Sequence, residues 1–287
     1  MTAVLKHELK NYFHSLTAYV FGAFLLIVIG IGAMMYNISA AVSNFEYVLG
    51  FASMVFIVIV PILTMRTIAE EKKQRTDQLL YCLPISTTEV VCGKYSALII
   101  VFLLPLLVVC IYPLVFMKYG AVHLLTAYGS LFAFFLAGAA LLALGVFISS
   151  ITDNQGLAAG IGIAVILFNY YSVSLAENIS STSFGSLIVI LIFFVILGMI
   201  VKNLTQNKNM AYITSLVFMI ITVLMYINDS ALFEGLVPEV MRKLSIFDRL
   251  DIFVNGVFDI ASIVYFITFT VFFLFLSVQS LEKRRYN

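Results

Sequence analysis

Long apolar runs without charged residues dominate the pattern of hydrophobic and polar positions along the chain. A membrane-crossing helix needs about 20 predominantly apolar residues, and eight runs approach or exceed that length. They are Ala18–Tyr36, Tyr47–Met65, Tyr95–Met117, Leu124–Ser149, Gly156–Ala176, Gly185–Val201, Ala211–Ile227 and Ser262–Val278. The pattern predicts an all-α polytopic membrane protein with about eight transmembrane helices.

The runs at Gly185–Val201 and Ala211–Ile227 allow a second interpretation, because the first of them spans only about 17 residues. In that case the chain has six spans and a re-entrant hairpin at 185–227.

Lysine and arginine are distributed unequally between the alternating loops. If the N-terminus is cytosolic, twelve basic residues face the cytosol: Lys6, Lys10, Arg66, Lys72, Lys73, Arg75, Lys94, Lys202, Lys208, Lys283, Arg284 and Arg285. Only Lys118, Arg242, Lys243 and Arg249 face outward. Because cytosolic loops carry the excess of basic residues, we expect a multi-pass protein of the plasma membrane with both termini in the cytosol.

Composition narrows the function classes. Hydrophobic residues make up 62% of the 287 residues and charged residues 11%, against roughly 25% charged in soluble domains. The spans leave no room for a separate soluble catalytic domain, so residues 1–287 are expected to form a single transmembrane domain. The net charge of +1 gives no electrostatic case for binding nucleic acid. The three cysteines are not spaced for a zinc site or a disulfide framework, and no cleavage site of a signal peptide follows the first run.

Residues 1–17 are amphipathic. Apolar residues recur at helical spacing opposite polar ones: Leu5, Leu9, Tyr12, Phe13 and Leu16 against Lys6, His7, Lys10, Asn11 and His14. This pattern predicts a helix lying in the inner membrane interface; the alternative is a solvated extension of the first span.

The expected extracellular segment, residues 228–261, contains two further amphipathic stretches, around Leu232–Leu244 and Phe247–Phe258. They predict short helices held at headgroup level by aromatic residues. Phe247, Phe253 and Phe258 are candidates for an outer gate; the alternative is a membrane-resting loop without a gating role.

The cytosolic segment 66–94 is the most structured polar stretch of the chain. Its charges are spaced for a helix, with Glu70 facing Lys73 and Glu71 facing Arg75. Pro84 prevents that helix from continuing, and Ser86 with Glu89 three residues later predicts a capping box that starts the next helix.

Leu79 and Leu80 form an exposed apolar tip on this segment, which indicates a partner protein; the alternative is an ordinary solvated loop. A shorter inner loop carries Asp153, Asn154 and Gln155 and is a possible second contact. Thr152 with Gln155 gives a weak cap signal there.

The sequence lacks the residues that proton transport, a phosphate-binding loop, catalysis and metal binding each require. No apolar run holds a charged residue or histidine well inside it, which disfavours self-powered proton transport. Gly93 and Lys94 do not form a phosphate-binding loop, because Thr88 and Tyr95 stand where glycine and serine or threonine are required. No catalytic set or metal cluster is apparent.

Several segments resemble the permease subunit of ABC-2 type transporters, most closely the branch of the gliding-motility and nitrous-oxide-reductase maturation permeases. The specific segment is PILTMRTIAEEKKQRTDQLLYCLPISTTEVVCGK; the supporting ones are KHELKNYFHSLTAYVF, GVFISSITDNQGLAAG, FDRLDIFVNGVFDIASIVYF and LEKRR. Together they cover roughly half of the chain. Relative to the usual six spans, this chain has an extra pair at 185–227.

The resemblance implies that the stretch matching Arg66–Ser86 is a coupling helix seated in a groove of a separate cytosolic ATPase, and that two permeases, identical or homologous, assemble with two ATPases. By matching position, the coupling residues are expected to be Arg66, Glu70, Glu71, Arg75, Thr76, Leu79, Leu80, Pro84 and Ser86. This chain is then a non-catalytic subunit that binds no cofactor, because ATP and Mg²⁺ bind in the partner. It works in the lipid bilayer and binds no nucleic acid.

The sequence therefore predicts the permease subunit of an ATP-driven exporter. One alternative is a secondary transporter or channel that works alone, and another is a membrane enzyme acting on lipid, for which Asn169 and the neighbouring tyrosines offer the only start.

Overall fold

The computed structural model describes residues 1–76, 86–118, 120, 122–178, 182–205 and 208–286 of the chain. Throughout these residues the regular elements are helices. The chain divides into two compact units, unit 1 with residues 1–170 and 246–287 and unit 2 with residues 171–245. Each unit is described by itself.

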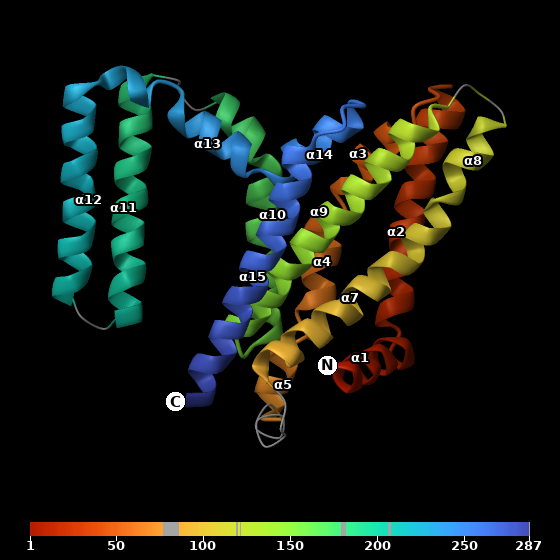
Figure 1. Cartoon of the computed structure of the whole chain (residues 1–287), viewed down its shortest axis with the longest axis horizontal. Helices are drawn as coiled ribbons and strands as arrows, with labels where there is room; N and C mark the ends of the chain where they lie inside the picture. The colour runs from red at the N-terminus through yellow and green to blue at the C-terminus, as the bar shows by residue number, and fades with distance from the viewer. Residues whose placement is uncertain (77–85, 119, 121, 179–181, 206–207, 287) are drawn as a thin grey trace. The chain divides into compact units, whose positions relative to one another are not determined.

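Unit 1 holds the helices from both ends of the chain (Figure 1). In order they are α1 (Thr2–His14), α2 (Thr17–Ala33), the π-helical turn η1 (Met34–Ser39), α3 (Glu46–Ser53), α4 (Phe56–Thr64), α5 (Ala69–Gln74), α7 (Thr87–Val109), α8 (Ile111–Met117), α9 (Leu124–Ile151), the first part of α10 (Gln155–Asn178), α14 (Ile246–Val254) and α15 (Ile260–Tyr286).

Helix α9 is the centre of unit 1. Within an apolar 18-residue window of this helix, 78% is buried. The helix packs against α3, α4, α7, α8, α14 and α15. Small residues allow these close approaches: a Cβ atom at Gly138 would overlap the Phe102 ring, and one at Gly145 would overlap the Thr64 side chain. Around Gly138, the ring of Phe56 packs against Phe102 and Phe134.

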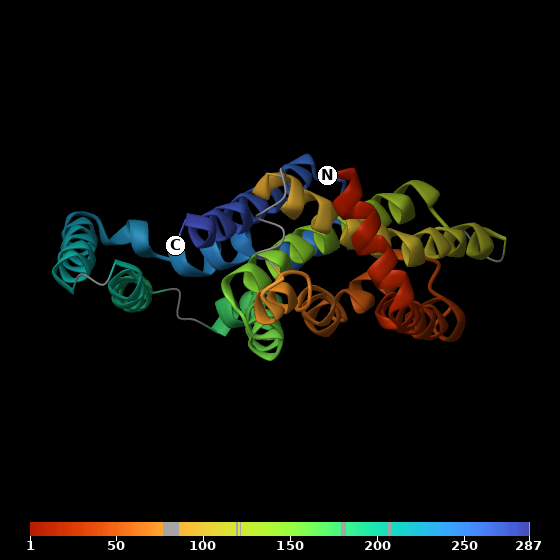
Figure 2. The same ribbon diagram turned by 90° about the horizontal axis from the view of Figure 1, so that it is seen from below.

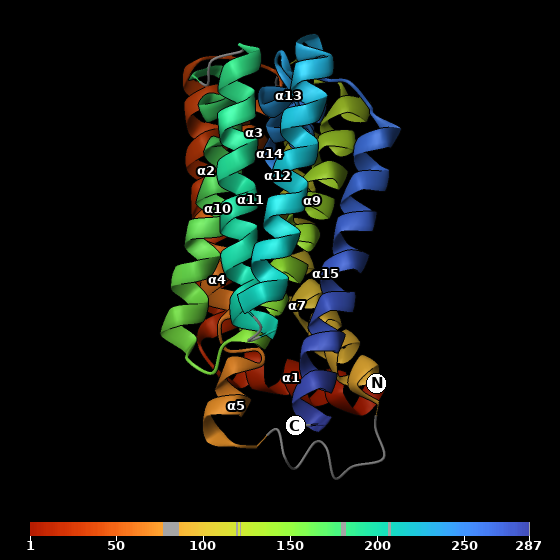
Figure 3. The same cartoon turned by 90° about the vertical axis from the view of Figure 1, so that its left-hand side faces the viewer.

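Both chain termini lie at the same end of unit 1, together with α1 and α5 (Figures 1 and 3). This end is called the α5 end below. Helix α1 lies crosswise to α2 there, and Figure 2 shows it along its length. The predicted helix at 1–17 is therefore present, but the face that packs against protein is Val4, Glu8 and Tyr12, while Phe13 and Leu16 are exposed. Its position in a membrane interface stays a prediction.

Unit 2 contains the end of α10, then α11 (Ser183–Thr205), α12 (Lys208–Asn228), the 3₁₀ turn η2 (Ser230–Phe233) and α13 (Leu236–Leu244). Helices α11 and α12 pack against each other, with Phe194 and Phe218 stacked at 5.3 Å between ring centroids. The extra pair expected at 185–227 is thus a pair of packed helices inside this unit. The short helices expected in 228–261 are also present, as α13 in unit 2 and α14 in unit 1.

The predicted spans all fall on helices, and several apolar helices make the chain a membrane protein. Among the described residues, five helices are long and apolar enough to cross a membrane, or up to seven if each of two bent pairs counts as one span. The five are Thr17–Ser39, Thr87–Met117, Leu124–Ile151, Gln155–Asn178 and Ile260–Arg284. The exact number of spans, expected to be eight, stays a prediction.

The apolar run Tyr47–Met65, expected to form one span, is broken into two helices. Helices α3 and α4–α5 within Glu46–Gln74 meet at 58°. At the break, the Ser53 hydroxyl donates to the Gly50 carbonyl at 2.7 Å, and the next amides bond three residues back, Ile57 to Met54 and Val58 to Val55. Serine bonding to its own helix backbone favours such a bend, and the apolar pattern does not reveal it.

Packing at Gly145 gives the first prediction. Gly145→Ala places a methyl group against Thr64, which is buried and bonded to its own helix, and such overpacking typically costs about 1–3 kcal/mol. We expect the melting temperature, followed by circular dichroism of the purified protein, to fall. Gly160→Ala is the control, because a Cβ there meets no atom within 4 Å; equal melting temperatures for the two variants would contradict the close α4–α9 contact.

Candidate functional site

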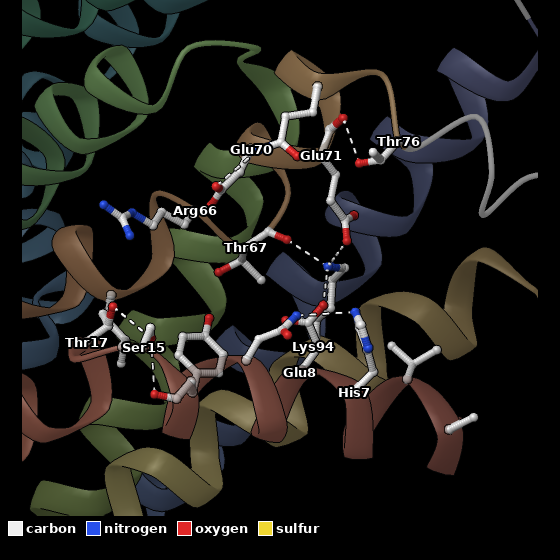
Figure 4. Close-up of a pocket in the computed structure, with 16 residues that line it drawn as sticks. His7, Glu8, Ser15, Thr17, Arg66, Thr67, Glu70, Glu71, Thr76 and Lys94 are labelled. Carbon is white, nitrogen blue, oxygen red and sulfur yellow. Dashed lines mark hydrogen bonds and ion pairs between the residues drawn. The ribbon is translucent and has the colours of Figure 1, made fainter.

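A buried lysine joins three separate elements at the α5 end. Lys94 lies in the second turn of α7 and is 2% exposed. Its Nζ donates to Glu8 Oε1 at 2.6 Å, to Glu71 Oε1 at 2.7 Å and to the Thr67 carbonyl at 2.9 Å. All three ammonium protons are therefore used, and Figure 4 shows their acceptors converging from α1, α5 and the turn before α5.

Burial makes this cluster energetically demanding. A buried charge is tolerated only when it is paired and hydrogen-bonded, and here one ammonium group is shared by two carboxylates. Removing the lysine would leave both carboxylates in a buried site without their cation. The cluster therefore binds α1 and α5 to α7 more firmly than a surface ion pair could.

The local sequence brings α1 close enough to α7 for these bonds. Gly93 precedes Lys94, and a Cβ atom at Gly93 would lie 3.0 Å from the Val4 side chain and 3.3 Å from the Met1 carbonyl. Tyr12, two turns further along α1, is also buried. Burial raises the pKa of its hydroxyl, so Tyr12 stays neutral beside the carboxylates.

The N-terminus of α5 is held by α9. Ser149 is completely buried, and its hydroxyl oxygen accepts from the amides of Ile68 at 3.1 Å and Ala69 at 3.0 Å while donating to the Met65 carbonyl. The hydroxyl thus satisfies amides that a helix start leaves unpaired, although it comes from another helix. Lys72, buried on α5, donates to the Ser150 carbonyl next to it.

Helix α5 ends sooner than the sequence suggests. The expected helix continues toward Pro84, but Arg75 adopts a left-handed conformation with φ 57°. The Thr76 amide bonds to the Glu71 carbonyl and the Arg75 amide to the Lys72 carbonyl, which together form a Schellman ending. Glycine usually occupies the left-handed position of this motif. Because arginine stands there in this chain, the sequence did not predict that the helix ends at this point.

The inner loop between α9 and α10 lies beside α5, where the sequence places a second contact. Asp153 Oδ1 is 2.5 Å from Arg284 on α15 and 3.8 Å from Lys72 on α5. Asn154 caps α10 through a 2.9 Å bond from the Gly156 amide to its side chain, so the cap is Asn154 rather than Thr152. Gln155 is the first residue of α10.

A pocket of about 700 Å³ opens between α1 and α5 beside the Lys94 cluster (Figure 4). Most of its lining residues are polar or charged, and four of them are predicted site residues. The predicted residues are Arg66, Glu70, Glu71 and Thr76; the others include Glu8, Tyr12, Ser15, Thr17, Thr67 and Lys94. In Figure 4 the Arg66 guanidinium points away from Lys94.

The remaining predicted residues separate into three groups. Ser86 forms the expected capping box with Glu89, which confirms that prediction. Arg75 ends α5, as described above. Leu79, Leu80 and Pro84 lie outside the described residues.

Two of the three candidate gate residues belong to the core. Phe247 and Phe253 on α14 are buried, and Phe258 is 61% exposed. Phe247 packs edge-on against Tyr170 at 5.0 Å, and Asn169 accepts the Ile246 amide at 3.0 Å. Asn169 thus holds α14 to α10. A gating role of these phenylalanines stays a prediction.

Sequence reasoning missed Glu8, Lys72, Lys94 and Ser149, because each acts across a long sequence separation. Glu8 and Lys94 are 86 residues apart, and Ser149 lies about 80 residues from the amides it caps. One signal was present: Lys94 borders an apolar run directly, where a charge needs a partner.

No group of three or more metal-ligating side chains is found in the part of the chain that the structure describes. His7 Nε2 instead lies 3.2 Å from the Asn11 side chain, and His14 Nδ1 lies 3.1 Å from the Lys10 carbonyl.

A family model described as "ABC-2 family transporter protein" matches residues 35–232, a range that begins in η1 and ends in η2. No curated protein matches the chain.

The Lys94 cluster gives the second prediction. Lys94→Met removes the shared cation from the buried Glu8 and the half-buried Glu71, which we expect to cost about 3–5 kcal/mol and to lower the melting temperature measured by circular dichroism. Lys73→Met is the matched control, because Lys73 is exposed on α5. The triple variant Glu8→Gln, Glu71→Gln, Lys94→Met should recover part of the loss. A melting temperature of Lys94→Met equal to that of Lys73→Met would refute the proposed role of the cluster.

The third prediction concerns the cap on α5. Ser149→Ala leaves the amides of Ile68 and Ala69 without their acceptor, a loss of about 0.5–2 kcal/mol, and should speed hydrogen exchange at the start of α5. Ser277→Ala is the control, because Ser277 is equally buried but bonds only to the Phe273 carbonyl of its own helix among the described contacts. If exchange over residues 68–72 is the same in both variants, Ser149 does not hold α5.

Proposed function

Because the chain belongs to the ABC-2 transporter family, we propose that it is the membrane-spanning permease subunit of an ATP-driven exporter. A separate cytosolic ATPase binds and hydrolyses ATP with Mg²⁺, and this chain converts the movement of that ATPase into a change of access across the membrane. It performs no chemistry itself. A second copy, or a homologous permease, completes the assembly.

Two finer assignments belong to the proposal. The resembling segments favour the branch of the gliding-motility and nitrous-oxide-reductase maturation permeases, and the excess of basic residues puts the α5 end and both termini in the cytosol of a plasma-membrane protein. The shared location of the two termini at one end of unit 1 (Figure 3) agrees with that orientation. Residues 185–227 add a helix pair to a single permease domain.

The observation that carries the proposal is the attachment of α5. Lys94 binds Glu71 on α5 to α7, Ser149 on α9 caps the start of α5, and Lys72 bonds to the Ser150 carbonyl. Helices α7 and α9 are both long enough to cross the membrane. A displacement of α5 is therefore transmitted to membrane-crossing helices through buried bonds.

The ATPase is expected to contact the segment that α5 begins. Its contact residues in this proposal are Arg66, Glu70, Glu71, Arg75, Thr76, Leu79, Leu80, Pro84 and Ser86, with Asp153, Asn154 and Gln155 as a second inner contact. Asp153 supports the second contact, because its side chain stays 63% exposed while it pairs with Arg284 and Lys72. Glu71 bonds inward to Lys94 and Ser86 caps α7, so both position the contact more than they form it.

Co-purification with a candidate ABC ATPase tests the proposal and gives the fourth prediction. Leu79→Asp and Leu80→Asp each place a charge where an apolar contact is required, and we expect each to reduce the recovered ATPase about tenfold, equivalent to about 1.4 kcal/mol of binding. Leu125→Asp is the control, because Leu125 is 88% exposed at the opposite end of α9.

Two results would contradict the proposal. One is equal recovery of the ATPase with Leu79→Asp, Leu80→Asp and Leu125→Asp. The other is transport by the purified chain in vesicles without any ATPase, which would favour a secondary transporter or channel.

A further inference from the structure

An apolar groove adjoins the polar pocket at the α5 end of unit 1. The groove lies between α2 and α4 and has a volume of about 200 Å³. Thr17 and Leu63 line both the pocket and the groove. A ligand occupying both would have a polar part between α1 and α5 and an apolar part between two membrane helices.

The groove is built for hydrocarbon. Its buried side consists of Phe21, Ile59 and Leu63, and its rim consists of exposed apolar side chains: Val20, Phe24, Val58 and Ile62. Helix α2 lies in a membrane-length span and α4 in a bent pair that can cross as one span. The occupant therefore comes from the bilayer rather than from water.

An occupant from the bilayer is a lipid, and the charged side chains of the pocket indicate which lipid headgroup would bind there. Glu8, Glu70 and Glu71 oppose Arg66 and Lys94, so the charged lining has one carboxylate in excess. Glu8 and Glu71 are engaged with Lys94. Glu70 accepts a long 3.3 Å bond from Gln74 and keeps acceptor capacity for a donor.

The same pocket also contains a side chain that can bind a phosphate group. The Arg66 guanidinium is exposed and points away from Lys94 (Figure 4), and a guanidinium matches the geometry of a phosphate. Thr67 lines the pocket beside it.

From this arrangement we infer that the pocket and groove together bind phosphatidylethanolamine, a bilayer phospholipid whose headgroup carries a phosphate and a primary ammonium and no carboxylate. Arg66 binds the phosphate, Glu70 accepts from the ammonium, and an acyl chain lies in the groove. Phosphatidylglycerol is less suitable, because its headgroup has a phosphate and no cation and is repelled by the excess carboxylate. Phosphatidylcholine is less suitable, because its quaternary ammonium cannot donate a hydrogen bond to Glu70. The inference goes beyond the proposed function and does not depend on an ATPase.

The absence of tryptophan from the chain allows a direct test and gives the fifth prediction. Val58→Trp on the groove rim and Val108→Trp on α7 introduce single fluorophores at positions that are each 46% exposed. Each variant is reconstituted in vesicles that contain phosphatidylethanolamine, phosphatidylglycerol or phosphatidylcholine with brominated acyl chains, which quench tryptophan on contact. The purified full-length chain is used without any ATPase.

We expect brominated phosphatidylethanolamine to bind next to the indole of the Val58→Trp variant about tenfold more tightly than the other two lipids. This difference equals about 1.4 kcal/mol, which one charge-assisted hydrogen bond can supply. In the Val108→Trp variant the three lipids should quench equally. In the Val58→Trp background, Glu70→Gln should reduce the preference, whereas Arg66→Gln should weaken the binding of all three lipids through their shared phosphate. Glycerophosphoethanolamine, the headgroup without acyl chains, should not displace the lipid at equal concentration.

Equal quenching of the Val58→Trp variant by the three lipids would show ordinary boundary lipid and overturn the inference. Displacement by glycerophosphoethanolamine would identify a soluble phosphate ester as the occupant, which also overturns it. If Val58→Trp does not fold, Val20→Trp on the same rim, 63% exposed, replaces it. A failed lipid test leaves the co-purification experiment unaffected, so the two proposals fail separately.

Discussion

The ammonium group of Lys94 is the interaction on which the α5 end depends. A lysine at 2% exposure must be compensated where it stands, since the cost of desolvating its charge exceeds what a single imperfect bond returns. Its three acceptors come from α1, α5 and the turn before α5. Helices α1 and α5 are short, and neither could stay folded on propensity alone; the buried cation gives both of them a fixed place on α7.

The same constraint explains why small and polar residues gather near this end. Gly93 lets α1 approach α7, and Gly145 lets α4 approach α9 just before the turn that carries Thr67. Ser149 then supplies the cap that α5 lacks in its own sequence. None of these residues would indicate a special role on its own, because glycine and serine also occur elsewhere in apolar helices. Together they hold a short charged segment against helices long enough to cross a membrane.

Much of the fold could be predicted from the sequence, because apolar runs and local caps are local signals. The eight runs all lie on helices, and the capping box at Ser86 and Glu89 forms as predicted. The break at Ser53, the left-handed Arg75 and the Lys94–Glu8 pair could not be predicted, since they depend on a serine rotamer, a rare conformation for arginine and a contact between residues 86 apart. The family model supports the permease assignment, whereas the coupling residues stay predictions.

The charged side chains at the α5 end differ in whether they are engaged within the chain or available to a ligand. Lys94 holds Glu8 and Glu71 inward, so the groups left to meet anything outside the chain are Arg66, at an exposed position, and Glu70, at a half-buried one. Both line a pocket that opens beside α5 and adjoins, at Thr17 and Leu63, the apolar groove between α2 and α4. A lipid seated there would contact the turn before α5 and the start of α2 at once. Its occupancy would then favour one position of α5 over another, because a ligand shifts an equilibrium only through its different affinity for the two states.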